Sequence, residues 1–255
     1  MRLDAYAERF CAAGYACLVF DYRNFGDSEG QPAATALHRH AACGLGRGDG
    51  LRPNPGGHRS KANRLVGHVF WRGHVIATAA RLPGIAAAVA QCPFTDGIAS
   101  ARTLSPFIFM RVGALAARDL VASWFERSPV MVPTPGKPGE VALMNAPDVY
   151  PGYMRLVPEG QTVPNEVAAR FALRVITYRQ GRLAAKITCP ILFCVCETDS
   201  VAPAVPTLRY AAKAPRGEVR RYPEGHFAIY VDDAFERVVA DQLAFLDKHL
   251  KGPRA

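Results

Sequence analysis

Hydrophobic positions near the start of the chain recur with the period of a helix. This pattern predicts one helix that ends at Gly14, in the position of a C-terminal cap. The apolar run at residues 15–20 (YACLVF) has the length of a buried strand, and the polar stretch at 21–32 predicts a loop after it. The apolar face of the first helix consists of Leu3, Tyr6, Ala7, Phe10 and Cys11.

The same patterns resume after residue 73. Strands alternating with helices predict an α/β fold with a mostly parallel sheet and helices on both faces. Residues 94–185 are rich in proline and have mixed helical patches, which suits an inserted lid. We therefore divide the chain into a first core part (1–93), the lid (94–185) and a second core part (186–255). The predicted elements are helices at 74–81, 203–214 and 235–250, and strands at 85–91, 190–196 and 218–222.

Composition is that of a globular protein, with 255 residues of which 49% are hydrophobic. No apolar run reaches the roughly 18 residues of a membrane span, and Met1 to Asp4 lack the layout of a signal peptide. We expect a cytoplasmic protein with no membrane partner. The seven cysteines show no metal-ligand spacing, and Cys194 and Cys196 alternate within an apolar run, so we expect both as small buried residues of a strand.

The net charge of +9 is concentrated in one segment. Residues 38–73 hold six arginines, one lysine and one aspartate, with eight glycines and no clear periodicity. The segment lacks aromatic residues interleaved for base stacking, so we expect no nucleic-acid partner, although a basic binder built on it stays an alternative. Its four histidines suggest a metal site only weakly, and we expect no metal and no cofactor. They are His38, His40, His58 and His68.

Two segments carry candidate chemistry. Residues 194–203 (CVCETDSVAP) and 221–230 (RYPEGHFAIY) each place polar residues directly after a predicted strand. Ligands of parallel sheets bind at the carboxyl ends of strands. An acid followed by a histidine matches the last two members of the chain order nucleophile, acid, base. The histidine takes the proton of the nucleophile, and the carboxylate fixes its tautomer.

Together with FDYRNFGDSEG at 20–30 and CPFTDG at 92–97, these segments resemble actinobacterial α/β-hydrolases related to serine aminopeptidases and small esterases. The resemblance implies an α/β-hydrolase fold with Asp199 as triad acid and His226 as triad base. Glu197 is a competing acid, and the simpler alternatives are a helix cap for Asp199 and an ordinary loop histidine for His226.

The resemblance also implies a nucleophile elbow, G-x-S-x-G, before the helix at 74–81. The local sequence is GHVFW at 67–71, which places Val69 where the nucleophile belongs. Residues 38–71 can be back-translated with codons that the genetic code permits and then read in the frame that starts at the second base of each codon. One permitted result encodes an amphipathic helix, a strand and the elbow GTSFG, in that order. We therefore interpret residues 38–73 as frame-shifted.

The family also has three strands before the helix at Leu3, so the resemblance implies that the first strands are missing here. We predict a chain of serine-hydrolase descent, for ester, thioester or small peptide bonds, that is inactive as printed. Its partner is a small-molecule substrate or ligand under the lid. The alternative is a non-catalytic small-molecule-binding protein, and the oligomeric state is not predicted.

Overall fold

The computed structural model describes residues 3–17, 19, 73–160 and 165–251. The helices and strands predicted after residue 73 are confirmed, with small shifts of their ends. The described elements, in chain order, are α1 (Leu3–Ala12), α3 (Gly73–Arg81), β1 (Ala88–Gln91), α4 (Gly97–Ala101), α5 (Pro106–Trp124), β2 (Met131–Pro133), α6 (Val149–Arg155), β3 (Glu166–Ala168), α7 (Phe171–Thr177), the 3-10 helix η1 (Gln180–Lys186), β4 (Ile191–Cys196), α8 (Ala204–Ala211), β5 (Gly217–Tyr222), the 3-10 helix η2 (Ala228–Tyr230), α9 (Asp232–Leu246) and the π-helical η3 (Asp247–Lys251).

Three parallel strands form the described part of the main sheet, in the order β1-β4-β5. Val89 lies opposite Leu192 in the first pair, and Phe193 lies opposite Val219 in the second. Strand β4 is buried along its whole length, because it has a strand on each side and helices above and below. The apolar run that predicted this strand therefore reflects burial of both its faces.

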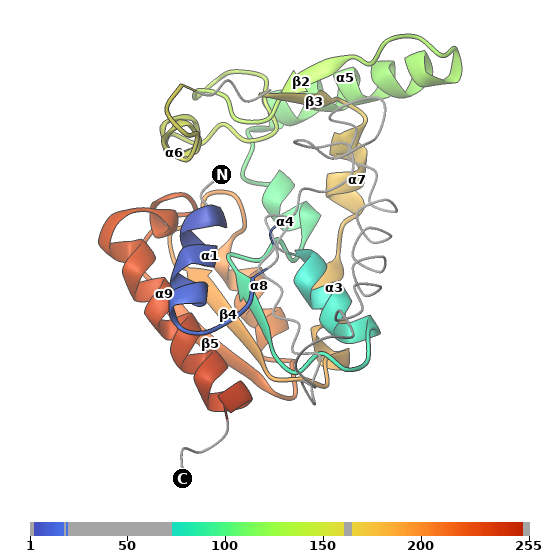
Figure 1. Cartoon of the computed structure of the whole chain (residues 1–255). Helices are drawn as coiled ribbons and strands as arrows, with labels where there is room; N and C mark the ends of the chain where they lie inside the picture. The colour runs from blue at the N-terminus through green and yellow to red at the C-terminus, as the bar shows by residue number, and fades with distance from the viewer. Residues whose placement is uncertain (1–2, 18, 20–72, 161–164, 252–255) are drawn as a thin grey trace.

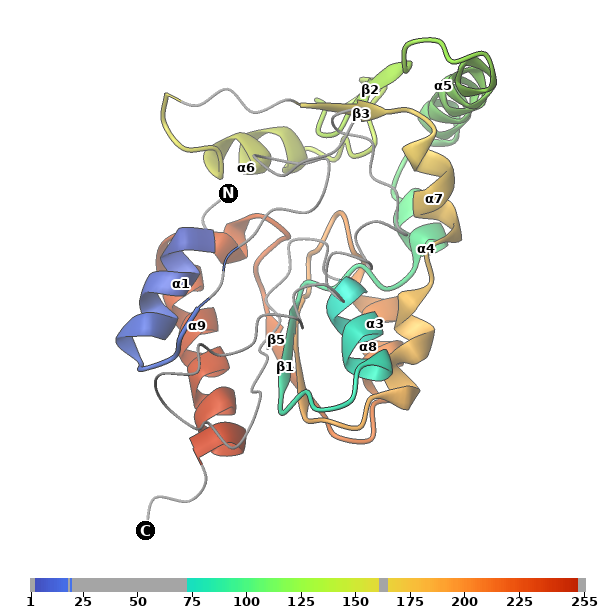
Figure 2. The ribbon, with the colours of Figure 1, turned by 45° about the vertical axis from the view of Figure 1, so that its right-hand side comes forward.

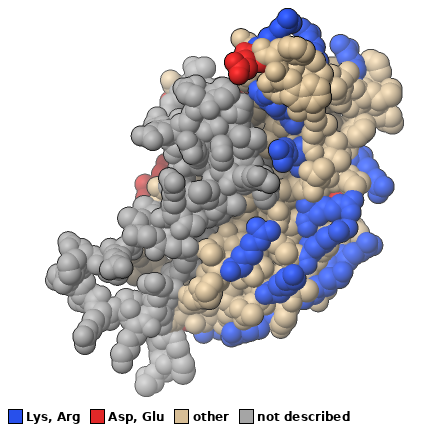
Figure 3. Space-filling model, turned by 90° about the vertical axis from the view of Figure 1, so that its right-hand side faces the viewer, with Lys and Arg blue, Asp and Glu red and all other residues tan. Residues whose placement is uncertain are grey.

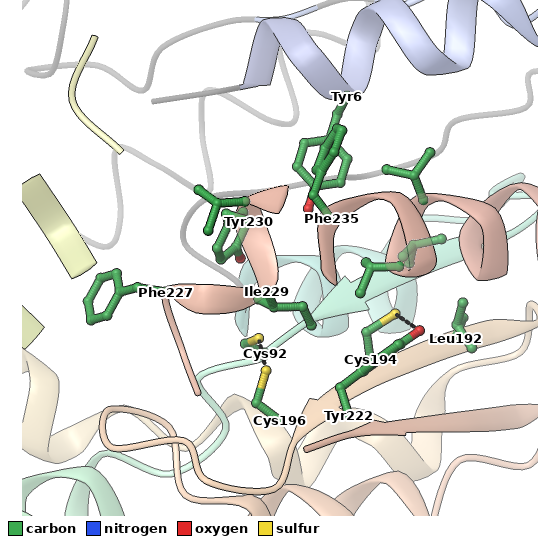
Figure 4. Close-up of a cluster of buried hydrophobic side chains, with 14 of the residues drawn as sticks. Tyr6, Cys92, Leu192, Cys194, Cys196, Tyr222, Phe227, Ile229, Tyr230 and Phe235 are labelled. Atoms are coloured by element: carbon green, nitrogen blue, oxygen red, sulfur yellow. Dashed lines mark hydrogen bonds between the residues drawn. The ribbon is translucent and has the colours of Figure 1, made fainter. Parts of the chain in front are cut away.

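Alternation along β4 divides the core into two layers. Leu192, Cys194 and Cys196 face α1 and α9, whereas Ile191, Phe193 and Val195 pack in the cluster that includes α3 and α8. Figures 1 and 2 show α1 and α9 on one side of the sheet and α3 and α8 on the other. Figure 4 shows the first layer, where Tyr6 of α1 and Phe235 of α9 lie above the strands. The predicted α/β class, with helices on both faces, is confirmed.

Helix α1 forms as its periodicity predicted and buries Tyr6 and Phe10. Gly14 follows in the left-handed region, with φ of +88°, as expected of a C-terminal cap. The predicted strand at 15–20 is wrong for its described residues: 15–17 and 19 form no strand. Cys17 and Val19 are exposed, and among the described residues no strand lies beside them to supply the hydrogen bonds that a buried strand requires.

Residues 97–177, from α4 to α7, lie between β1 and β4 in the chain, and we call them the insert. Figures 1 and 2 show α5, β2, β3 and α6 lying across one end of the main sheet. The side chain of Asp119, on α5, is fully buried and accepts the backbone N–H groups of Val130 and Arg170 at 2.8 and 2.9 Å. Arg170 Nε adds an ion pair at 3.1 Å, so this one carboxylate ties α5 to the small antiparallel sheet of β2 and β3.

Within the described residues, no helix combines the length and the apolar character needed to cross a bilayer.

Candidate active site

The first half of the site is the loop between β4 and α8. Asp199 is in this loop, three residues after the strand ends at Cys196. Its Oδ1 accepts the backbone N–H groups of Val201 and Ala202 at 2.8 and 2.6 Å. These bonds close a tight turn and fix the carboxylate at the carboxyl end of the strand. The alternative that Asp199 only caps a helix is wrong, because the N-cap of α8 is Pro203 and no side chain caps that helix; Asp199 closes the turn that precedes it.

The second half is the loop after β5, which contains His226. Cys196 and Tyr222 are partners at the ends of two neighbouring parallel strands, so both loops leave the same edge of the sheet. His226 Nδ1 lies 2.7 Å from both carboxylate oxygens of Asp199. The two side chains are buried, with 9% of the histidine side chain and 1% of the aspartate side chain exposed.

This geometry has a defined chemical capacity. An N–H at Nδ1 donates to the carboxylate, which leaves Nε2 as the ring nitrogen for proton transfer. The negative charge of Asp199 also stabilises the imidazolium form of His226, which is the form a base reaches after it accepts a proton. The structure thus brings together the two residues singled out from the sequence, in the arrangement that an acid–base pair of a triad requires.

Glu197, the competing acid, lies elsewhere. Its side chain is 44% exposed and forms an ion pair with Arg221 at 2.9 Å. Successive residues after β4 point in different directions, and the turn at Val201 and Ala202 selects Asp199 for the histidine. Sequence alone could not make this choice, since both acids follow the same strand.

Helix α6 of the insert contacts both loops of the pair. Asp148 Oδ2, at its N-terminal end, accepts the hydroxyl of Ser200 at 2.9 Å. One turn further along, a Cβ on Gly152 would lie 2.6 Å from the Cβ of Phe227, closer than real Cβ atoms come. The ring of Tyr153 packs edge-on against that of Phe227, with ring centroids 6.4 Å apart. The insert therefore packs directly against the two loops that hold the acid–base pair, through residues that the sequence analysis did not identify.

The only signal for that contact in the sequence was the glycine inside the short helix α6, which is costly there unless a close neighbour requires it.

The motif CPFTDG at 92–97 has a structural role in the described fold. Asp96 caps α4 by accepting the N–H groups of Ile98 and Ala99 at 3.1 and 3.2 Å. Its other oxygen accepts the hydroxyl of Tyr210 from α8 at 3.0 Å. The glycine at 97 is required by close packing, because a Cβ there would lie 1.7 Å from the carbonyl oxygen of Val175. The motif thus anchors the first helix of the insert.

One group of potential metal ligands occurs among the described residues. The ligand atoms of Cys92, Cys196 and Asp199 lie within 4.8 Å of one another. The two sulfurs are 3.2 Å apart, shorter than the roughly 3.7 Å that two thiolates span on a tetrahedral zinc ion. The carboxylate already accepts two amides and the histidine, so the group fits a resident metal poorly.

The remaining sequence candidates lie outside the described residues. These are Val69 at the expected nucleophile position, the proposed frame-shifted segment 38–73 apart from its last residue, and the histidines His38, His40, His58 and His68.

Comparison with known proteins agrees with this fold. No family model matches the chain. It is 49% identical to the quorum-quenching protein AidA of Acinetobacter baumannii over 97% of this chain and 82% of AidA. Among solved structures, it resembles the α/β hydrolase GrgF of Penicillium sp. sh18, with a TM-score of 0.79, 24% identity and coverage of 98% of this chain and 85% of GrgF. It also resembles a Paleococcus ferrophilus monoacylglycerol lipase, with a TM-score of 0.69, 18% identity and coverage of 97% and 89%. The α/β-hydrolase fold expected from the sequence is thereby confirmed.

Proposed function

This chain belongs to the family of the quorum-quenching protein AidA, and from that premise we propose that Asp199 and His226 are the acid and base of a serine-hydrolase triad whose nucleophile is lost in the chain as printed. The observation that carries the proposal is the contact of His226 Nδ1 with both carboxylate oxygens of Asp199 at 2.7 Å. A buried pair of this kind, at the carboxyl edge of a parallel sheet, is suited to move a proton at Nε2.

The reaction class is hydrolysis of an ester, a thioester or a small peptide bond. In an intact site a serine would attack the carbonyl while His226 accepts its proton, and water would later release the acyl group. Valine has neither a proton to give nor a lone pair to attack with, so Val69 cannot take this part. We therefore propose that the printed chain is inactive, and that its ancestor carried the elbow encoded in the alternative frame.

The substrate class follows from the relative and from the insert. AidA is a quorum-quenching protein, so a small signal molecule with a hydrolysable acyl bond is the substrate we propose for the restored site. Residues 94–185 would serve as its lid. The contacts of Asp148 with Ser200, and of Gly152 and Tyr153 with Phe227, support this role because they set α6 beside the acid–base pair.

Three proteins test the proposal: the unmodified chain, its Val69→Ser variant, and a chain with the alternative frame restored over 38–73. The first should give no ester hydrolysis above a blank without enzyme. The second should also fail, because a serine needs the strained elbow and aligned N–H donors, each worth about 3–4 kcal/mol of barrier. The third should be active.

In the restored protein, changing His226 or the new serine should lower turnover by several orders of magnitude, and Asp199 somewhat less. Glu197→Gln is the matched control and should leave the activity unchanged, since Glu197 is paired with Arg221 away from His226. A folded, restored protein that hydrolyses no ester, thioester or peptide and does not react with a fluorophosphonate probe would refute the catalytic proposal.

In that event the second candidate gains support: a protein that binds a small molecule without turnover, which the loss of the nucleophile favours. A basic nucleic-acid binder is the third. Lys and Arg side chains are spread over the described part of the face in Figure 3, but the excess found in the sequence lies at 38–73. A steep salt dependence of DNA binding by the printed chain would identify this third function.

A further inference from the structure

Two buried thiols meet beneath the acid loop. Cys92 follows β1 and Cys196 ends β4, and their sulfurs are 3.2 Å apart although 104 positions separate them in the chain. Figure 4 shows the two side chains pointing toward each other below Ile229 and Phe227. Neither thiol has a part in the acid–base chemistry described above.

The backbone at Cys92 directs this approach. Its φ of +40° is unusual for a residue with a side chain, and its N–H donates to the carbonyl of Cys194 at 2.7 Å. The chain therefore turns sharply after β1 while it stays hydrogen-bonded to β4, and Sγ is carried across to the neighbouring strand. A non-glycine residue keeps such a backbone conformation only where the surrounding structure holds it there.

The other buried cysteines are differently placed. Cys194 lies on the same face of β4, but its sulfur is contacted by Tyr222 Oη and Gln242 Nε2 at 4.0 and 3.8 Å. Cys189 is in the other core layer, with α3 and α8. Among the described cysteines, Cys92 is thus set to react with Cys196 and not with its neighbours.

We propose that Cys92 and Cys196 are a reversible disulfide site that closes in response to a peroxide and reopens with a dithiol reductant. The sulfurs must approach by about 1.2 Å to reach the usual bond length of about 2.05 Å, a shift that side-chain rotation can supply. This proposal does not depend on the hydrolase proposal.

The chemistry balances in two steps. One thiolate attacks hydrogen peroxide, the O–O bond breaks, and a sulfenic acid and water form after the thiol proton is taken up. The second sulfur then displaces the hydroxyl group from the sulfenic sulfur, the S–S bond forms, and a second water leaves. Two thiols lose two electrons in total and one peroxide gains them. A dithiol reverses the bond by exchange.

The consequence is a covalent ring that contains the whole insert, since β1 precedes it and β4 follows it. The ring closes three residues before Asp199, at the strand end that positions the acid. Because a closed ring of this size restricts the unfolded chain, oxidation should raise the Tm. Both thiols are buried, so we expect the exposed Cys11 and Cys17 to react sooner.

Peptide mapping of the printed, unmodified chain after treatment with hydrogen peroxide is the test. Cleavage after Lys and Arg places Cys92 in peptide 82–102, Cys11 and Cys17 together in 10–23, and Cys43 in 40–47. We expect peptide 82–102 to become linked to 187–209 through Cys196, and to be released by dithiothreitol. Peptide 187–209 also contains Cys189 and Cys194, so the link should persist in a Cys194→Ala variant and be lost in Cys196→Ala.

The rise in Tm on oxidation should likewise persist in Cys194→Ala and disappear in Cys92→Ala. The proposal is overturned if peptide 82–102 stays unlinked long after 10–23 is fully oxidised, or if it is joined to Cys43, Cys189 or Cys194. The mapping uses the unmodified chain, so its result holds even if one of the variants fails to fold.

Discussion

Replacing Asp199 separates its structural role from its effect on His226. The alanine variant removes the acceptor of three buried or half-buried donors: the N–H groups of Val201 and Ala202, and Nδ1 of the histidine. A donor left without a partner costs about 1–3 kcal/mol, so for three donors we expect a loss of about 3–9 kcal/mol. A total free energy of unfolding is typically about 5–15 kcal/mol, and the variant should therefore be close to unfolding.

The asparagine variant keeps Oδ1 for the two backbone amides but replaces the other oxygen with an NH₂ group. The loss should be about 1–2 kcal/mol, the difference between charge-assisted and neutral hydrogen bonds. The NH₂ group now donates to Nδ1 of His226, so the ring proton should move from Nδ1 to Nε2. In a triad this tautomer would prevent Nε2 from accepting a proton.

Urea denaturation measures the free energies of unfolding of the Asp199→Ala and Asp199→Asn variants, and the ¹⁵N chemical shifts of the His226 ring report its tautomer. Glu197→Gln is the control, since it removes an exposed acid two positions away and should cost less than about 1 kcal/mol. The reasoning fails if Asp199→Ala is as stable as the unmodified chain, or if Asp199→Asn retains a proton on Nδ1 at neutral pH.

Three further predictions concern the insert and the core. Asp119→Ala should destabilise the protein by about 2–6 kcal/mol, because two N–H groups and a guanidinium lose their partner, and amide exchange in β2 and β3 should quicken. Unchanged exchange there would contradict the role given to this carboxylate. Gly97→Ala should lower the Tm because the new Cβ meets a backbone carbonyl at 1.7 Å, whereas Gly113→Ala, with nothing within 4 Å in mid-helix, should be stabilising by up to about 1 kcal/mol. Equal effects at the two glycines would refute the packing argument. Burial raises the pKa of the Cys194 thiol from 9.0 to about 12. Its contribution to stability is therefore complete below pH 9 and is lost as the pH rises toward 12. In Cys194→Val the urea concentration at the midpoint of unfolding should fall less steeply between pH 9 and pH 12. An unchanged dependence of this midpoint on pH would contradict the role given to the thiol.

Much of the fold could be predicted because the relevant information is local. The run at 190–196 became β4, and the run at 3–11 became α1, since each carries the period of its element. The prediction at 15–20 was wrong for its described residues for a complementary reason. A strand depends on hydrogen bonds from a neighbouring strand, and an apolar run does not reveal whether that neighbour is there.

The candidate site divides in the same way. Asp199 and His226 could be singled out because each follows a strand, and parallel neighbours deliver such loops to one edge. Helix α6 could not be placed beside them, since Gly152 indicates only that some close neighbour exists, and the sequence does not identify Ser200 or Phe227 as the residues that α6 meets. That contact joins segments about fifty and seventy-five positions apart, and only the packed chain defines it.

By itself, then, the sequence determined the order of strands and helices, the two-sided burial of β4, and an acid and a histidine on successive loops. The tertiary structure decided that Asp199 and not Glu197 meets the histidine, because the turn at Val201 and Ala202 holds one carboxylate inward while Arg221 pairs with the other. It also brought Cys92 to Cys196 across two strands. Periodicity is a property of neighbouring residues, whereas these choices depend on which distant segments share one edge of the sheet.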